Sequence, residues 1–177
     1  MTRFRPWASA DLSAEDSASH GRCLRARRPI EAGELLVVWG GRVVSFDELA
    51  RLPREFAPHA LQVDDDRFLV SEPPWPDADH VNHSCDPNGV LRGARALESR
   101  RPIAAGEEIT YDYATSDSTP YDEFECRCGA RSCRGRVASD DWRRGNLWTA
   151  YDGRFSPYLR RRRMALRTAR EPIAPGR

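Results

Sequence analysis

Three cysteines in the last third of the chain have the spacing of metal ligands. Cys126, Cys128 and Cys133 form the pattern C-x-C-x4-C, and cysteines separated by one residue are poorly placed to form a disulfide with each other. A structural zinc site needs four ligands in a tetrahedron, and Cys85 and Cys23 are the two candidates for the fourth position. Ordinary buried thiols are the alternative, but three cysteines within eight residues favour a metal site.

Two polar motifs precede these cysteines. Residues 82–88 read NHSCDPN, and residues 106–113 read GEEITYDY. Taken alone, the first motif is typical of a turn, because Asn, Asp and Pro favour turns, and the second is typical of a half-buried strand. In this order, and followed by C-x-C-x4-C, the motifs resemble the SET-domain family. Its members are lysine methyltransferases that use S-adenosylmethionine, and some carry a zinc-binding post-SET segment.

The resemblance extends from about residue 21 to residue 135 and implies a complete zinc site. In the family, the cysteine of the NHSC motif joins the three post-SET cysteines. This assigns Cys85 as the fourth ligand beside Cys126, Cys128 and Cys133, and it leaves Cys23 free. Such a site would attach the post-SET segment to a loop that is distant in sequence, so zinc binding would stabilise that segment.

The resemblance also implies a cofactor site for S-adenosylmethionine. The Asn-His pair of the NHSC motif contacts the cofactor in the family, and the glycine-rich cofactor loop aligns best with residues 21–26. The residues predicted to bind the cofactor are Gly21, Arg22, Cys23, Asn82 and His83. The chain departs from the family pattern at Cys23, where a second glycine is usual, and at Asp79, where many members have an arginine.

The tyrosines of the GEEITYDY motif are the predicted catalytic residues. Tyr113 matches the catalytic tyrosine of the family, and Tyr111 matches the position where Tyr or Phe influences how many methyl groups are added. Methyl transfer is an in-line displacement by a neutral amine, so the protein must align the reactants, exclude water and place oxygen dipoles around them. Residues two apart on a strand share one face, which predicts both hydroxyls on the same side. Two ordinary core tyrosines are the alternative.

The fold class implied by the resemblance is mostly β. It is the SET-domain (β-clip) fold of small curved sheets with a threaded loop, followed by a post-SET segment with a four-cysteine zinc site and a short helical C-terminal extension. Short β-branched runs joined by proline-rich connections agree with this. Strands are predicted at 35–39, 60–63, 67–70 and 109–113, and helices at about 46–52, after a capping box, and at 157–168, with proline at the first helical position.

Four segments follow from these patterns: an N-terminal segment at 1–19, the SET domain at 20–119, the zinc segment at 120–137, and the extension at 138–177. Aromatic residues between 140 and 155 are expected to pack onto the domain or onto a second copy of it. The last nine residues are expected to be disordered. Val137 or Trp142 is a candidate to close the substrate channel, and Arg160–Arg163 is either a solvated helix end or a contact for nucleic acid.

Composition excludes several classes of function. The net charge is +1, so no overall field favours nucleic acid or membrane. No run approaches the roughly 18–20 apolar residues that span a bilayer, and the N-terminus lacks the apolar region of a signal peptide. A soluble, cytoplasmic protein is therefore expected. All 28 basic residues are arginine, so the protein could not modify a lysine of its own.

The sequence therefore predicts an S-adenosylmethionine-dependent methyltransferase with structural zinc. Its predicted substrate is a lysine side chain in another protein, such as a basic histone-like or ribosomal one. One alternative is a catalytically inactive SET-like module that binds protein, which the departures at Cys23 and Asp79 would favour. Another is a zinc-stabilised nucleic-acid binder that uses Arg160–Arg163.

Overall fold

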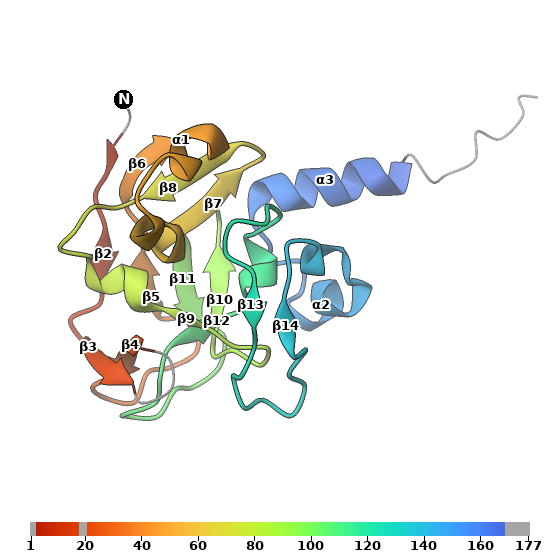
Figure 1. Ribbon diagram of the computed structural model, residues 1–177. Coiled ribbons are helices and arrows are strands. Elements are labelled where there is room, and N and C mark those ends of the chain that lie inside the picture. Colours follow the sequence, from red (N-terminus) through yellow and green to blue (C-terminus); the bar gives the residue numbers. More distant parts are fainter. Residues whose placement is uncertain (1–2, 18–20, 169–177) are drawn as a thin grey trace, which may run out of the picture.

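A computed structural model of the chain describes residues 3–17 and 21–168, and Figure 1 shows a β-rich body from which one helix projects. The described strands form two four-stranded sheets and three two-stranded pairs. This arrangement agrees with the predicted mostly β fold of small sheets.

Both larger sheets are antiparallel. The first has the order β1 (Arg3–Phe4), β6 (Gly41–Val44), β8 (Arg67–Val70) and β7 (Ala60–Asp64). The second has the order β10 (Gly89–Arg92), β11 (Ala96–Ser99), β5 (Leu35–Val38) and β2 (Trp7–Ala8). The pairs are β3 (Leu12–Ser17) with β4 (Gly21–Ala26), β9 (Asn82–His83) with β12 (Thr110–Tyr111), and β13 (Phe124–Glu125) with β14 (Arg136–Val137).

Helices are short except at the C-terminal end. The α-helices are α1 (Phe46–Ala50), α2 (Gly145–Ala150) and α3 (Pro157–Thr168), and 3-10 helices cover Arg54–His59, Asp77–His80, Tyr113–Thr115 and Asp141–Arg143. The predicted capping box of α1 is confirmed. The Ser45 side chain accepts from the Glu48 N–H, and the Glu48 carboxylate accepts from the Ser45 N–H at 2.7 Å.

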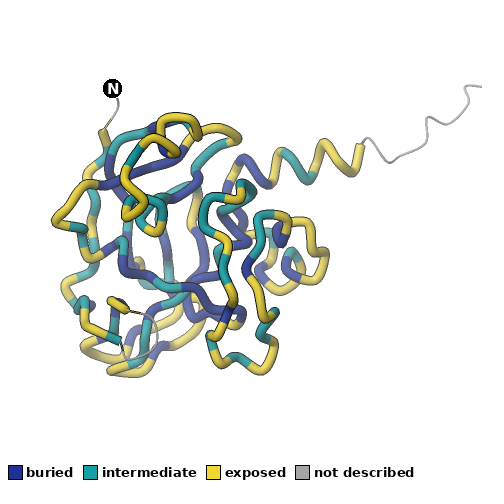
Figure 2. Tube along the Cα trace, in the orientation of Figure 1, coloured by how far each residue is buried: buried dark blue, intermediate teal, exposed yellow. Residues whose placement is uncertain are grey.

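The main core is formed by side chains from both larger sheets and from the β3–β4 pair, and several strands bury two or more consecutive residues. Leu24, Leu36, Val37, Leu97 and Ile109 are each exposed by 1% or less. Burying one such side chain contributes about 1.5–3 kcal/mol. Figure 2 shows this buried path through the central strands, whereas α3 becomes exposed toward its end. The core therefore holds the strands that carry the two polar motifs.

The pairing of β9 with β12 brings the two polar motifs together. The strands run parallel, with Tyr111 opposite His83. Asn88, the last residue of NHSCDPN, fixes the partner strand from the side: its amide donates to the Glu108 carbonyl at 2.8 Å and accepts from the Thr110 N–H at 2.9 Å. Because Asn88 is only 2% exposed, these bonds replace water for the strand's backbone groups.

The tyrosine strand is shorter than predicted. β12 ends at Tyr111, and a 3-10 helix begins at Tyr113. The cause is Asp112, whose carboxylate accepts from the Ala114 N–H at 3.0 Å and so caps the helix. The two tyrosines therefore do not share one strand face, although their ring centroids lie 4.8 Å apart.

The two ends of the described chain both pack on the domain. The N-terminal segment, which the sequence set apart, supplies β1 and β2 as edge strands of the larger sheets. At the other end, the predicted packing of the aromatic residues is confirmed by a second core made of Ala114, Trp142, Leu147, Tyr151, Phe155, Tyr158 and Leu159. The predicted disorder of residues 169–177 falls outside the described residues.

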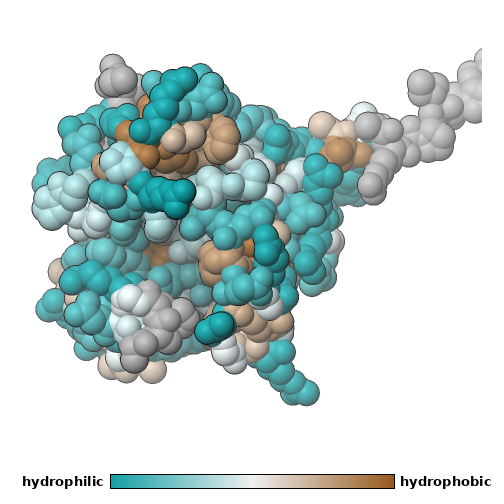
Figure 3. All heavy atoms as spheres, in the orientation of Figure 1, coloured by the Kyte–Doolittle hydropathy of each residue, from teal (hydrophilic) through white to brown (hydrophobic). Residues whose placement is uncertain are grey.

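The surface seen in Figure 3 is mostly hydrophilic. Exposed large apolar side chains include Phe46 on α1 and Met164 and Leu166 on α3. Among the described residues, no helix has the length and hydropathy to cross a bilayer.

Candidate functional site

Four cysteines converge as a ready cluster of metal ligands. The Sγ atoms of Cys85, Cys126, Cys128 and Cys133 all lie within 4.8 Å of one another, and those of Cys85 and Cys126 are 3.8 Å apart. Zn–S bonds of about 2.3 Å in a tetrahedron place sulfurs about 3.8 Å apart, so the cluster fits Zn²⁺. Cys23 is fully buried on β4, outside this group. The choice of Cys85 over Cys23 as fourth member is therefore supported.

Backbone donors surround the sulfurs of this cysteine cluster. The Cys85 N–H points at the Cys128 Sγ at 3.4 Å, and the Arg134 N–H points at the Cys85 Sγ at 3.4 Å. Such donors stabilise thiolates, whereas burial raises the pKa of the Cys85 thiol. A cation that binds thiolates would resolve this conflict, which is the chemistry of a structural zinc site.

A buried ionic network, here called the Arg134 junction, joins the cysteine cluster to the tyrosine motif. The Arg134 guanidinium donates to both carboxylate oxygens of Asp112 at 2.7 Å and to Asp141 at 3.1 Å. The Tyr151 hydroxyl donates to Asp112 at 2.8 Å. Asp112 and Asp141 are each 1% exposed. The junction therefore links three segments that are far apart in sequence.

A wide cavity of about 440 Å³ opens beside the NHSC motif. Its walls include Arg22, Trp75, Asn82, Tyr113 and Phe124. The Asn82 amide donates to the Arg22 carbonyl at 3.1 Å and to the Glu108 carboxylate at 2.9 Å. These two bonds position Asn82 between β4 and β12. The cavity has the size and mixed lining of a small-molecule site.

The five predicted cofactor residues occupy different positions around this cavity. Arg22 and Asn82 line it, whereas Gly21, Cys23 and His83 are not in its walls. The Cys23 side chain is buried and does not narrow the wide cavity. Cofactor contact by the three residues outside the walls stays a prediction.

His83 connects the cysteine cluster to the predicted catalytic tyrosine, Tyr113. Its Nδ1 accepts from the Tyr113 N–H at 3.3 Å, which leaves Nε2 to carry the proton toward the Cys85 Sγ, also at 3.3 Å. Burial lowers the pKa of His83 to about 4, so the ring is neutral. His83 therefore supports the backbone that carries Tyr113.

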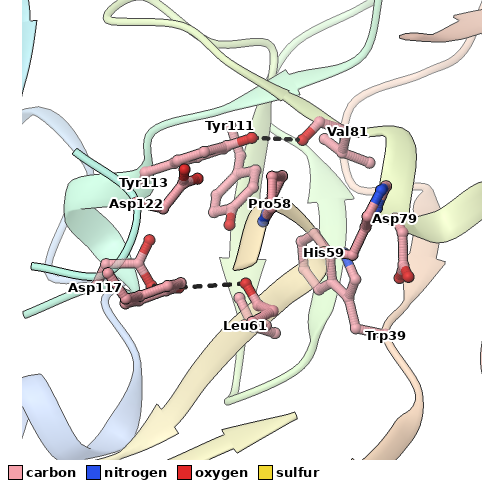
Figure 4. Close-up of a pocket in the computed structure, with 12 residues that line it drawn as sticks. Trp39, Pro58, His59, Leu61, Asp79, Val81, Tyr111, Tyr113, Asp117 and Asp122 are labelled. Atoms are coloured by element: carbon pink, nitrogen blue, oxygen red, sulfur yellow. Dashed lines mark hydrogen bonds between the residues drawn. The ribbon is translucent and has the colours of Figure 1, made fainter. Parts of the chain in front are cut away.

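A narrow cavity of about 20 Å³ adjoins the wide one. This volume holds roughly one water-sized group. Figure 4 shows Tyr111 and Tyr113 beside it, with the Tyr113 hydroxyl donating to the Val81 carbonyl at 3.2 Å. The Trp39 ring lies 5.2 Å from that of Tyr111. Five residues line both cavities, and the predicted catalytic tyrosine is one of them: Pro58, His59, Asp79, Tyr113 and Asp122.

Three carboxylates in the narrow cavity were not singled out as site residues from the sequence. Asp79, Asp117 and Asp122 contribute to its walls, and Figure 4 shows Asp117 and Asp122 across the cavity from Asp79. Burial raises the pKa of Asp79 and of Asp117 to about 7. Asp117 and Asp122 lie between the tyrosine motif and the cysteines, where the sequence looks like a polar loop. Their closeness to Tyr113 was the available signal.

The residues that close the narrow cavity differ from the prediction. Val137 packs against Cys85 and Cys126, and Trp142 belongs to the C-terminal core. Neither lines the cavity, which is closed by Tyr121 and Asp122 from the segment before the cysteines. The reason is that the Arg134 junction and the cysteine cluster draw residues 134–142 to the other side of the tyrosine motif.

Comparison with known families identifies one match. The family model of the SET domain matches residues 21–114, which is more than half of the chain. Asn82 of the wide cavity and Tyr113, which lines both cavities, lie inside this range.

Curated relatives are similar over about two thirds of the chain. Human histone-lysine N-methyltransferase 2B is 31% identical over 67% of the chain, and histone-lysine N-methyltransferase ash1 of Drosophila melanogaster is 30% identical over 72%. The chain spans only 5% and 6% of their lengths.

A solved structure supports the fold. The crystal structure of KRYPTONITE in complex with mCHG DNA and SAH aligns with a TM-score of 0.53 and 24% identity. The alignment covers 72% of this chain and 29% of the other.

Proposed function

The chain belongs to the SET-domain family, and from this membership we propose that it transfers a methyl group from S-adenosylmethionine to the ε-amine of a lysine in another protein. The observation that carries the proposal is the meeting of the wide and narrow cavities at Tyr113. A donor and an acceptor that enter from opposite sides would meet there.

The wide cavity fits the donor. Asn82 and the Arg22 backbone offer hydrogen-bonding groups, and Trp75 and Phe124 offer apolar surface for a nucleoside. The donor supplies a methyl group on a positively charged sulfur, which an amine nitrogen can accept as the S–C bond breaks.

The narrow cavity fits the end of an unbranched side chain. Its size admits one amine head, and the rings of Tyr111 and Trp39 keep bulk water out. Burial raises the pKa of the Tyr113 hydroxyl, so it remains neutral and presents an oxygen dipole to the reacting groups. The small volume beside Tyr111 supports addition of one or two methyl groups.

The cysteine cluster would hold a structural zinc ion through Cys85, Cys126, Cys128 and Cys133. The ion would fix the segment that follows Tyr121 and Asp122, and so keep the narrow cavity closed. Through their hydrogen bonds to Tyr113 and Asp112, His83 and the Arg134 junction would then hold Tyr113 in position.

The proposed substrate is a basic protein. The relatives named above are called histone-lysine methyltransferases, which supports a histone-like target, and the proposed cellular location is the cytoplasm. Nucleic acid is less favoured as a partner of the arginine run. Arg161 and Arg162 pair with Asp64 and Asp65, and Arg163 lies over the Trp148 ring.

An inactive binding module is the second candidate, and Asp79 is the observation that favours it. Its carboxylate lines the wide cavity at the position where many family members have an arginine. The other departure, Cys23, gives no support, because its side chain lies outside the cavity walls.

Transfer of a labelled methyl group tests the proposal. Wild-type protein and Tyr113→Phe are incubated with labelled S-adenosylmethionine and a panel of histones, ribosomal proteins and cell lysate. Tyr113→Phe is expected to lower the rate by about 100-fold while donor binding by calorimetry stays unchanged. Since the chain contains no lysine, label on the enzyme itself cannot come from lysine methylation. Donor binding without label on any protein would favour the binding module.

A further inference from the structure

The carboxylates of the narrow cavity lack the cations that other buried carboxylates have. Asp112 and Asp141 are both paired with Arg134. In contrast, within residues 3–17 and 21–168, no arginine or histidine forms an ion pair with Asp79, Asp117 or Asp122. A buried carboxylate without a cation costs free energy, and such groups concentrate where a protein binds or transforms a ligand.

Of the three carboxylates, Asp117 is the one that joins a chain of hydrogen bonds through Tyr121. Its Oδ1 accepts from the Tyr121 hydroxyl at 2.9 Å, and the same hydroxyl lies 3.2 Å from the Ala60 carbonyl. A hydroxyl has one hydrogen and two acceptor lone pairs. When Asp117 is ionised, Tyr121 donates to it. When Asp117 is protonated, it can donate to Tyr121, which then donates to Ala60. The pair therefore accommodates a proton without losing hydrogen bonds.

We propose that Asp117, supported by Tyr121, is the counter-ion of the incoming lysine ammonium and accepts its proton before methyl transfer. This inference rests on the proposed function of the site. The ammonium R–NH₃⁺ gives one proton to the Asp117 carboxylate, which yields R–NH₂ and a neutral carboxylic acid. The freed lone pair then forms the N–C bond while the S–C bond of the donor breaks and its electron pair stays on sulfur.

The electrostatic surroundings suit a base that works near neutral pH. Burial raises the pKa of Asp117 to about 7, and an effective general base has a pKa near the working pH. The titratable groups that face the cavity are Asp122 and Tyr121 on the same segment, Tyr111 and Tyr113 beside them, and His59 and Asp79 opposite. Tyr158 of α3 also interacts electrostatically with Asp117. These tyrosines are neutral near pH 7, and burial lowers the pKa of His59, so the carboxylates are the groups that change charge in this range.

The test compares Asp117→Asn with wild type and with two other variants. Asn keeps an acceptor for Tyr121 but cannot take a proton. The maximal rate on the substrate labelled by wild type is expected to fall by about 100-fold or more, with donor affinity unchanged by calorimetry. The rise of rate with pH near 7 should also disappear. Asp47→Asn on α1, which is exposed, should behave as wild type. A loss in Asp122→Asn but not in Asp117→Asn would overturn the assignment.

A second readout does not require turnover. n-Butylammonium mimics the lysine side chain, and 1-butanol is its uncharged analogue of the same size. Saturation-transfer NMR should show a preference for n-butylammonium in wild type and its loss, by at least about threefold, in Asp117→Asn. Equal preference in both proteins would overturn the counter-ion role. If wild type methylates nothing, the proposed function fails in that assay, while the butylammonium comparison still decides the present inference.

Discussion

The Arg134 junction and the narrow cavity place buried carboxylates on opposite sides of one short motif, in opposite electrostatic settings. In the junction, one guanidinium serves Asp112 and Asp141, and Tyr151 adds a further hydrogen bond. In the narrow cavity, Asp117 and its neighbours meet hydroxyls and rings but no cation among the described residues. In the junction, the guanidinium neutralises the carboxylates and stabilises the fold. In the narrow cavity, the unpaired carboxylates are placed to interact with the proposed ligand.

The separation follows from the residues around Tyr111 and Tyr113. Asp112 lies between them, and its carboxylate is held toward Arg134 because it caps the 3-10 helix that begins at Tyr113 and accepts two hydrogen bonds from the guanidinium. The polar network behind the motif therefore holds the tyrosines without entering the cavity. This comparison makes three predictions, which begin with the largest expected effect.

Removal of one cysteine should disrupt the cysteine cluster beside the Arg134 junction. Cys85→Ser leaves three ligands, and structural zinc contributes about 10–16 kcal/mol in small zinc domains, so loss of bound zinc is expected. Limited proteolysis should then cut the segment around residues 124–137. Metal analysis of the purified protein and proteolysis with and without a chelator measure both effects. Cys23→Ser is the matched control, and full zinc occupancy in Cys85→Ser would show that the ligand assignment is wrong.

Breaking the Arg134 junction should destabilise the protein strongly. Arg134→Met leaves Asp112 and Asp141 buried without a cation, which costs about 3–5 kcal/mol. Arg136→Met is a close control, because Arg136 pairs with Glu123 and Glu125 at the exposed surface and should cost about 1 kcal/mol or less. Urea unfolding measures both variants. Similar losses of unfolding free energy in the two variants would show that the buried ion pairs of Arg134 contribute no more than the exposed ion pairs of Arg136.

Removing the charge of Asp117 should stabilise the protein, and only at higher pH. The folded-state pKa is about 7, above the unfolded value of 3.8, so the folded protein carries an unfavourable carboxylate above pH 7. Asp117→Asn should therefore gain on the order of 4 kcal/mol at pH 8, roughly ten degrees in Tm. The gain shrinks steadily as pH falls below 7 and disappears below about pH 3.8, where the carboxyl group is protonated in both the folded and the unfolded state. Thermal unfolding at several pH values tests this, and a pH-independent difference would argue against it.

Local patterns predicted much of the fold. The strands predicted at 60–63 and 67–70 became β7 and β8, the capping box at Ser45 began α1, and Pro157 began α3. Each of these signals depends on neighbours within a few residues. Strands β1 and β2 were missed because they have two residues each, too few to show a period.

The sequence by itself determined the chemical parts: four cysteines of metal-binding type, an Asn-His pair and two tyrosines in a fixed order. Only the tertiary structure decided how they act together. It brought Cys85 to the other three cysteines, turned the chain at Asp112, and placed Asp117 and Asp122 beside Tyr111. The physical reason is that these outcomes depend on burial and on charges supplied by distant segments. In the sequence, Asp112 and Asp117 are both acidic residues near the tyrosines. Only the structure shows that Asp112 is paired with Arg134, whereas Asp117 lines the narrow cavity.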